Sequence, residues 1–202
     1  MPTRIPRLQG LSPREAAIEA QVLARVEANP DDYLAAYEKR FGNELNADNA
    51  AELFPEYAYS THTRTWNREA VHAAARWIIF ELFRRKVESA AEDGLRWVIF
   101  TSGGTGSGKS TRAAEWHGQP GALIYDSTFA HQEGAVKQIE MALAAGLGVL
   151  VYYTYRDPGE AFAGVLERAM GTGRGRTVRL MTHAESHRLS ALTIRQLAAR
   201  YT

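Results

Sequence analysis

The first part of the chain places apolar residues at helical spacing between polar ones. Residues 12–28 open with a Ser-Pro pair, which is typical of a helix start, and apolar side chains then recur every three or four positions. A second helix is predicted over 31–41, and a polar stretch with scattered aromatic residues, 43–66, is expected to be irregular. Residues 67–90 predict a long helix that is apolar almost all round and therefore largely buried.

The rest of the chain alternates short apolar runs with amphipathic segments. Strands are predicted at 96–102, 122–127 and 148–156, and helices at 133–145, 158–170 and 182–200. Because strands that alternate with helices form a parallel sheet covered by helices on both faces, the predicted fold class is α/β. We divide the chain into a helical N-terminal region, residues 1–66, packed on a core of residues 67–202 that includes an arginine-rich C-terminal lid.

Composition narrows the class of protein. With 202 residues, 45% of them hydrophobic and 23% charged, the chain has the make-up of an ordinary globular domain. It contains no cysteine, which excludes disulfides, thiolate metal sites and a cysteine nucleophile. No apolar run is long enough to span a bilayer, and the start lacks the apolar core of a signal peptide. We therefore expect a cytoplasmic location and no membrane partner, with delivery into a host or target cell as an open alternative.

Charge is balanced overall but uneven along the chain. The formal net charge of +1 gives no global attraction to nucleic acid. Residues 168–200, however, contain seven arginines and a single acidic residue. A local cationic segment in a near-neutral protein favours a small anionic ligand over a polymer.

One motif carries most of the functional information. Residues 103–110 match the pattern G-x-x-x-x-G-K-[ST] in full, between a predicted strand and a predicted helix. Glycines let successive backbone N–H groups turn toward phosphate oxygens, and the following helix directs its positive end at the same anion. We expect Lys109 to reach the β- and γ-phosphates of ATP and Ser110 to ligate Mg²⁺. The predicted nucleotide-binding residues are Gly103, Gly104, Thr105, Gly106, Ser107, Gly108, Lys109, Ser110 and Thr111.

The surrounding sequence separates three kinds of nucleotide-binding protein. A GTPase needs an N-K-x-D motif that reads the base, and the sequence has none. A motor ATPase needs an apolar strand that ends in Asp-Glu, whereas the candidate strand here is followed by Arg156, Asp157 and Pro158. A small-molecule kinase with a cationic lid fits best.

Phosphoryl transfer to a hydroxyl needs a proton acceptor and positive charge around the moving phosphoryl group. Asp126 ends the second predicted strand, at the sheet edge that carries ligands in α/β folds, and is our candidate base. Two alternatives stay open, because Asp126 also suits a turn cap or a role in holding Mg²⁺ through water. Among the arginines we prefer Arg168 and Arg176, with Arg179 and Arg188 second; for each, a solvated surface charge is the plain alternative.

The histidines are not predicted to bind a metal. His183 and His187 have i, i+4 spacing on a predicted helix, but no third ligand accompanies them, so we expect surface or hydrogen-bonding roles. His72 falls one turn into the apolar helix, where a histidine is usually a buried, hydrogen-bonded part of the core.

Together these segments resemble the zeta-toxin-like P-loop kinases, including effector relatives that phosphorylate NAD. The resemblance rests on VIFTSGGTGSGKST (98–111), LIYDSTF (123–129), VLVYYTYRDPGEAFAGVLERA (149–169) and the GRTV…THAESH stretch (175–187). Upstream, residues 45–58 and 67–83 look like the helical region that precedes the loop in many bacterial members. The resemblance implies a P-loop NTPase-type parallel sheet flanked by helices.

The resemblance also implies roles for individual residues. The implied catalytic residues are Asp126, acting as a base on a sugar hydroxyl, and Lys109, Arg168 and Arg176 on the transferring phosphate. The implied substrate-side residues are Ser127, Thr128 and His72. The chain departs from the family at residues 126–129, where one acid of a D-x-D-x-F pattern is missing, and Arg179 replaces a proline that usually follows the lid.

The sequence therefore predicts an ATP- and Mg²⁺-dependent kinase that phosphorylates a sugar hydroxyl of NAD or UDP-N-acetylglucosamine, with the departure at 126–129 favouring NAD. A toxin or effector role, and an antitoxin or chaperone-like protein that blocks the ATP site, follow from the resemblance alone. Two alternatives remain: a nucleotide-dependent switch without transfer activity, and a polynucleotide end kinase that grips its substrate through the arginine-rich segment.

Overall fold

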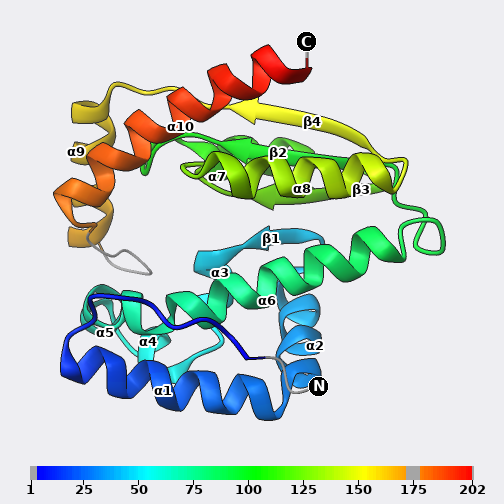
Figure 1. Cartoon of the computed structure of the whole chain (residues 1–202). Coiled ribbons are helices and arrows are strands. Elements are labelled where there is room, and N and C mark those ends of the chain that lie inside the picture. Colours follow the sequence, from blue (N-terminus) through cyan, green and yellow to red (C-terminus); the bar gives the residue numbers. More distant parts are fainter. Residues whose placement is uncertain (1–3, 172–177, 202) are drawn as a thin grey trace.

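A computed structural model describes residues 4–171 and 178–201 of the chain (Figure 1). The elements before the glycine loop are α1 (Pro13–Ala28), α2 (Pro30–Phe41), β1 (Glu44–Asn46), α3 (Ala47–Ala51), α4 (Pro55–Ala58), α5 (Thr61–Trp66), α6 (Arg68–Glu88) and β2 (Trp97–Ser102). The elements after it are α7 (Lys109–Ala113), the short 3₁₀ turn η1 (Ala114–Trp116), β3 (Ala122–Asp126), α8 (Gln132–Ala144), β4 (Gly148–Tyr153), α9 (Pro158–Met170) and α10 (Leu180–Tyr201). The predicted helices and strands of the second half are confirmed to within a few residues at each end.

The strands form one parallel sheet in the order β1-β3-β2-β4. The fold is therefore α/β with a P-loop NTPase-like sheet, as the sequence predicted. Because parallel strands end at the same edge, the register brings Asn46 of β1 and Thr101 of β2 next to Asp126 of β3. The glycine loop leaves β2 at this same edge, so three strand ends and the loop meet there.

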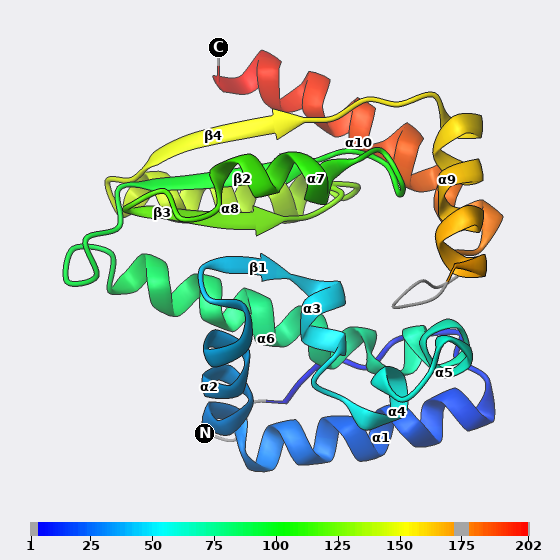
Figure 2. The same cartoon turned by 180° about the vertical axis from the view of Figure 1, so that it is seen from behind.

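Helices cover both faces of the sheet, as two opposite views show. α7 lies over one face in Figure 2, whereas α6, α8 and α10 lie over the other face in Figure 1. Val98 and Phe100 of β2, and Leu123 and Tyr125 of β3, share one buried core cluster with α6, as expected for side chains at alternate strand positions. Phe83 of α6 packs against Phe100 of β2 and Tyr125 of β3, with ring centroids 5.9 Å and 5.3 Å away.

Helix α6 is the central element of the core. The sheet lies on one side of it, and α1, α2 and α4 lie on the other (Figure 1). Ten of its side chains are buried, which confirms the prediction from its apolar pattern. None of the helices in the described part of the chain is long and apolar enough to cross a membrane.

The expectation of irregular structure over residues 43–66 was wrong. The segment contains β1 and three short helices, and β1 extends the sheet along the free side of β3. A strand of three residues is too short to show an alternating pattern, so hydrophobic periodicity could not reveal it. The helix starts were visible in the sequence, because Asn46 and Ser60 cap α3 and α5 with their side chains.

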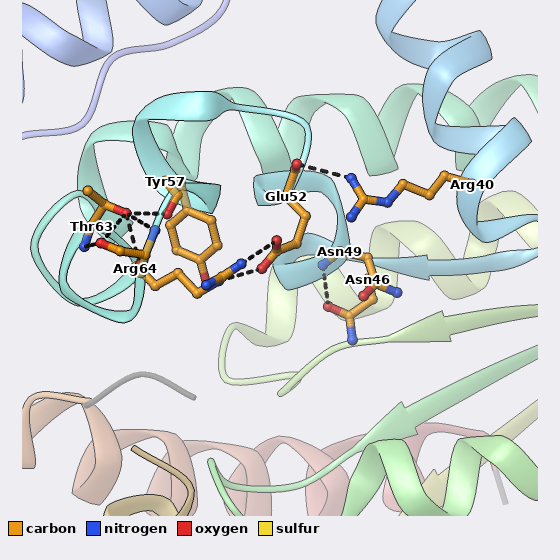
Figure 3. Close-up of polar contacts among 8 residues, drawn as sticks. Arg40, Asn46, Asn49, Glu52, Tyr57, Thr63 and Arg64 are labelled. Carbon is orange, nitrogen blue, oxygen red and sulfur yellow. Dashed lines mark hydrogen bonds and ion pairs between the residues drawn. The ribbon is translucent and has the colours of Figure 1, made fainter. Parts of the chain in front are cut away.

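A buried ion pair fastens these short helices together (Figure 3). Arg64 of α5 donates from Nε and Nη2 to the two carboxylate oxygens of Glu52, which follows α3, at 2.9 Å each. The side chains are only 10% and 9% exposed. Arg40 of α2 donates to the backbone oxygen of Glu52 at 3.2 Å, so α2, α3 and α5 share one anchor.

We expect Arg64→Ala to destabilise the protein by about 3 kcal/mol, because it leaves the buried Glu52 carboxylate without its partner. Urea unfolding measures the loss. Arg25→Ala, which breaks a more exposed pair with Glu56, is the matched control and should cost less than about 1 kcal/mol. Equal losses from the two variants would contradict the anchoring role of Arg64.

Candidate active site

The glycine loop, residues 103–108, connects the end of β2 to the start of α7 in the way the motif requires. Gly106 has φ +78°, and a Cβ there would lie 2.5 Å from the backbone oxygen of Ala161 in α9. Only glycine satisfies both the left-handed backbone and this close approach. Helix α7 has only five residues before the 3₁₀ turn, so the predicted contribution of a helix dipole is confined to that short segment.

Lys109 folds back over the loop that precedes it. Its Nζ donates to the backbone oxygens of Gly103 and Gly104, both at 2.9 Å. Burial lowers the pKa of the Lys109 ammonium, and the carboxylates of Asp126 and Asp48 oppose that shift. Because Lys109 is partly removed from water, its charge would attract an anion bound at the loop more strongly than a fully solvated charge would.

Asp126 lies at the centre of the sheet edge and is only 8% exposed. Its Oδ1 accepts from Thr101 Oγ1 at 2.7 Å, and its Oδ2 accepts from Asn46 Nδ2 at 2.7 Å and from Ser110 Oγ at 3.1 Å. Burial raises the pKa of Asp126, while Lys109 and the two hydroxyl donors act against that rise. The structure therefore joins the predicted Asp126, Lys109 and Ser110 into one cluster.

Sequence reasoning missed two residues of this cluster, Asn46 and Asp48. Asn46 donates to Asp126, and its Oδ1 accepts the backbone N–H of Asp48 at 2.7 Å. The same Oδ1 accepts the backbone N–H of Asn49 at 3.4 Å (Figure 3). This single amide therefore caps α3 and orients Asp126. Asp48 raises the pKa of both Asp126 and Lys109, which places a second carboxylate within electrostatic reach of the site. The Asn cap was the available signal, but it lay in a segment expected to be irregular.

His72 is connected to the site through Arg68. Arg68 lies on the first turn of α6, and its Nη2 pairs with Asp48 Oδ1 at 2.8 Å. Its Nη1 donates to His72 Nδ1 at 2.7 Å, so the histidine accepts at that nitrogen. Arg68 therefore links the predicted substrate-side histidine to Asp48.

Ser127 and Thr128 continue from Asp126 along the same edge and are half-buried. The Ser127 N–H donates to Thr101 O at 3.2 Å, and Ser102 Oγ donates to Thr128 O at 3.1 Å. Phe129 follows with φ +50°, a backbone conformation that is costly for a bulky residue. The segment is thus held tightly against the end of β2, next to the start of the glycine loop.

The predicted arginines are placed unequally. Arg168 is exposed on the last turn of α9, where its Nε donates to Gly164 O at 3.3 Å, and its charge helps to lower the pKa of Lys109. Arg179 lies 3.8 Å from Glu15 of α1 and is 73% exposed. Arg188 is exposed on α10, and Arg176 lies outside the described residues.

Comparison with known proteins adds one family match. A family model described as zeta toxin matches residues 119–202. The matched segment holds Asp126, Ser127, Thr128, Arg168 and Arg176, but it begins after the glycine loop. A search of curated proteins gives no match.

Proposed function

The chain is zeta-toxin-like over residues 119–202, and we propose that it is a kinase that transfers the γ-phosphate of ATP to a sugar hydroxyl of a nucleotide-type metabolite. The observation that carries this proposal is the cluster of Lys109, Asp126 and Ser110, in which a loop lysine and a buried carboxylate meet at one sheet edge. A kinase needs these two kinds of group within reach of one phosphate.

We assign the nucleotide phosphates to the glycine loop, with Lys109 as their main cation and Thr111 as a further contact. In the absence of nucleotide, Lys109 Nζ donates hydrogen bonds to two loop oxygens, Gly103 O and Gly104 O. A bound phosphate chain offers stronger, charge-assisted acceptors, so the amine exchanges carbonyls for phosphate oxygens when ATP binds.

The cluster also fits Mg²⁺, which prefers hydroxyl, carboxylate and phosphate oxygens. Ser110 is an exposed residue at the start of α7, and its Oγ donates to Asp126 Oδ2, so these two residues would hold the ion directly or through water. Mg²⁺ supplies positive charge that neutralises the phosphate oxygens during transfer.

Asp126 is our candidate for the catalytic carboxylate, either as the base or as the group that orients Ser110 and Mg²⁺. Its raised pKa suits a base, but three donors from the protein already occupy its oxygens. Asp126 would therefore serve either to orient Ser110 and the bound Mg²⁺ or to remove the proton of the acceptor hydroxyl. Asp48, whose side chain is 51% exposed, is the alternative group to take the proton of the acceptor hydroxyl.

Arg168 and Arg176 are proposed to stabilise the charge of the transferring phosphoryl group. Ser127, Thr128 and His72 are proposed to line the acceptor side, where NAD and UDP-N-acetylglucosamine are the leading substrates and NAD is preferred. Depletion of such a metabolite is toxic, so we propose a toxin or effector that works in the cytoplasm and is blocked by an antitoxin or chaperone-like inhibitor.

A mass-spectrometric screen tests the proposal. Purified protein, ATP and Mg²⁺ are incubated with NAD, UDP-N-acetylglucosamine, nucleosides and a short oligonucleotide, with Lys109→Ala in parallel. A phosphorylated metabolite that appears only with the unmodified protein identifies a kinase and its acceptor. Binding of ATP without transfer to any of them would contradict the proposal and favour a nucleotide-dependent switch, and transfer to the oligonucleotide alone would favour an end kinase.

A further inference from the structure

The last helix, α10, buries polar side chains along one face. The buried polar residues at helical spacing are His183, Ser186, His187, Ser190 and Thr193, each no more than 7% exposed. A helix in a globular protein normally buries apolar residues, and buried polar groups need hydrogen-bond partners. The partners of this face therefore indicate what the helix is for.

Two of these residues hold one residue of the glycine loop from both sides. The backbone N–H of Thr105 donates to Ser186 Oγ at 3.0 Å, and the Thr105 hydroxyl also lies 3.0 Å from that atom. His187 Nε2 donates to the backbone oxygen of Thr105 at 2.9 Å. Of the two roles expected for His187, at the surface or in a hydrogen bond, the structure shows the second, because the ring is buried and donates to the loop.

These contacts fix two successive peptide planes. In a trans peptide the N–H and the preceding C=O point in opposite directions. In the peptide between Gly104 and Thr105, the Gly104 oxygen accepts from Lys109 Nζ, and the Thr105 N–H at the opposite edge donates to Ser186 Oγ. In the peptide between Thr105 and Gly106, the Thr105 oxygen accepts from His187 Nε2, so the N–H of Gly106 is directed away from α10.

Packing adds to the hydrogen bonds. A Cβ on Gly104 would lie 2.2 Å from Cγ and Cδ2 of His187, so the ring rests directly on the loop backbone. His183 supports that ring, with centroids 4.6 Å apart, and its own Nε2 donates to Pro158 O at 2.8 Å. The loop is therefore clamped by groups more than seventy residues away in the chain.

We propose that Ser186 and His187 are positioning residues that orient the glycine loop for the phosphate chain of the nucleotide. The inference rests on the proposed function, because it assigns a role within the ATP site. Loop N–H groups bind phosphate well only when they are already aimed, so releasing Thr105 should weaken the binding of phosphate and leave the binding of the base and ribose unchanged.

The first test replaces Ser186 by Ala and measures dissociation constants for Mg·ATP, ADP and AMP by calorimetry. We expect Mg·ATP to bind about 3- to 10-fold more weakly, with AMP unchanged. Ser190→Ala is the matched control, since it removes a buried hydroxyl of α10 that donates to its own helix, at His187 O. Ser186→Thr, which keeps the hydroxyl, should restore most of the difference between ATP and AMP.

The second test is a double-mutant cycle on the packing of the His187 ring against Gly104. Gly104→Ala drives a methyl group into the His187 ring and should weaken Mg·ATP binding about 10- to 100-fold. In a His187→Ala background the space is open, so the same change should cost little further. Circular dichroism and melting temperature establish that each variant is folded.

The outcomes separate this inference from the proposed function. Failure of the unmodified protein to bind ATP would overturn both. Two results would overturn the positioning role and leave the kinase intact, provided that the unmodified protein binds ATP. The first is that Ser186→Ala binds ATP and AMP with the same dissociation constants as Ser190→Ala. The second is that the effects of Gly104→Ala and His187→Ala are additive.

Discussion

Lys109→Ala is expected to abolish measurable phosphoryl transfer, with kcat/KM lower by at least about 10²- to 10³-fold. Lys109 is the half-buried cation of the glycine loop, and its removal deletes the charge that the phosphate chain meets there. Both the affinity for Mg·ATP and the rate should fall, since the amine contacts the nucleotide before and during transfer. Steady-state kinetics on the acceptor found in the screen, with calorimetric ATP binding, measure the two effects.

The loss should occur without unfolding. Burial lowers the pKa of the Lys109 ammonium, so in the absence of nucleotide the charged form is unfavourable in the folded state. The melting temperature of Lys109→Ala should therefore stay close to that of the unmodified protein. Lys137→Ala is the matched control, because Lys137 lies on α8 against the ring of Phe80, away from the loop. A kinase that keeps its activity in Lys109→Ala would contradict the assignment of the ATP site.

The sequence was sufficient for the architecture of the second half of the chain. In long apolar strands and amphipathic helices, the spacing of hydrophobic residues indicates the type of element. Local patterns therefore predicted the strands β2, β3 and β4 and the helices α8, α9 and α10. β1 was not predicted, because a three-residue strand is defined by its pairing partner β3 rather than by its own residues. Tertiary pairing of this kind leaves no local signature.

The candidate site shows the same limit. The glycine loop and Asp126 were visible because motif and strand end lie in one stretch of sequence. Asn46 acts on Asp126 from eighty residues away, and Ser186 and His187 act on Thr105 from a similar distance. Single-sequence patterns carry no information on such contacts, so the residues that aim the site were found only in the structure.

Asp126→Asn is expected to lower phosphoryl transfer by about 10²- to 10⁴-fold while leaving the protein at least as stable. Asn retains the local hydrogen bonds, since its oxygen can accept from Asn46 and Ser110 and its amide can donate to the Thr101 hydroxyl. What it loses is the negative charge. Initial rates of transfer and of ATP hydrolysis to water, measured side by side, show which step needs that charge.

The stability of this variant should depend on pH in a defined direction. The pKa of Asp126 is raised above its ordinary value of 3.8 by burial, so ionisation of the carboxyl opposes folding. A group of this kind stabilises the fold below its unfolded pKa and loses that contribution as the pH rises through its folded pKa. In metal-free protein, the melting temperature of Asp126→Asn relative to the unmodified chain should therefore rise as the pH increases from about 4.

Comparison with Asp48→Asn then assigns the two carboxylates. If Asp126 orients Ser110 and the metal, its loss should reduce transfer and ATP hydrolysis together, because both reactions use the same nucleotide geometry. If Asp48 removes the acceptor proton, Asp48→Asn should reduce transfer and spare hydrolysis, since water replaces the acceptor. The reverse pattern, with hydrolysis intact in Asp126→Asn and transfer lost, would make Asp126 the base. Full transfer activity in Asp126→Asn would remove it from the catalytic machinery.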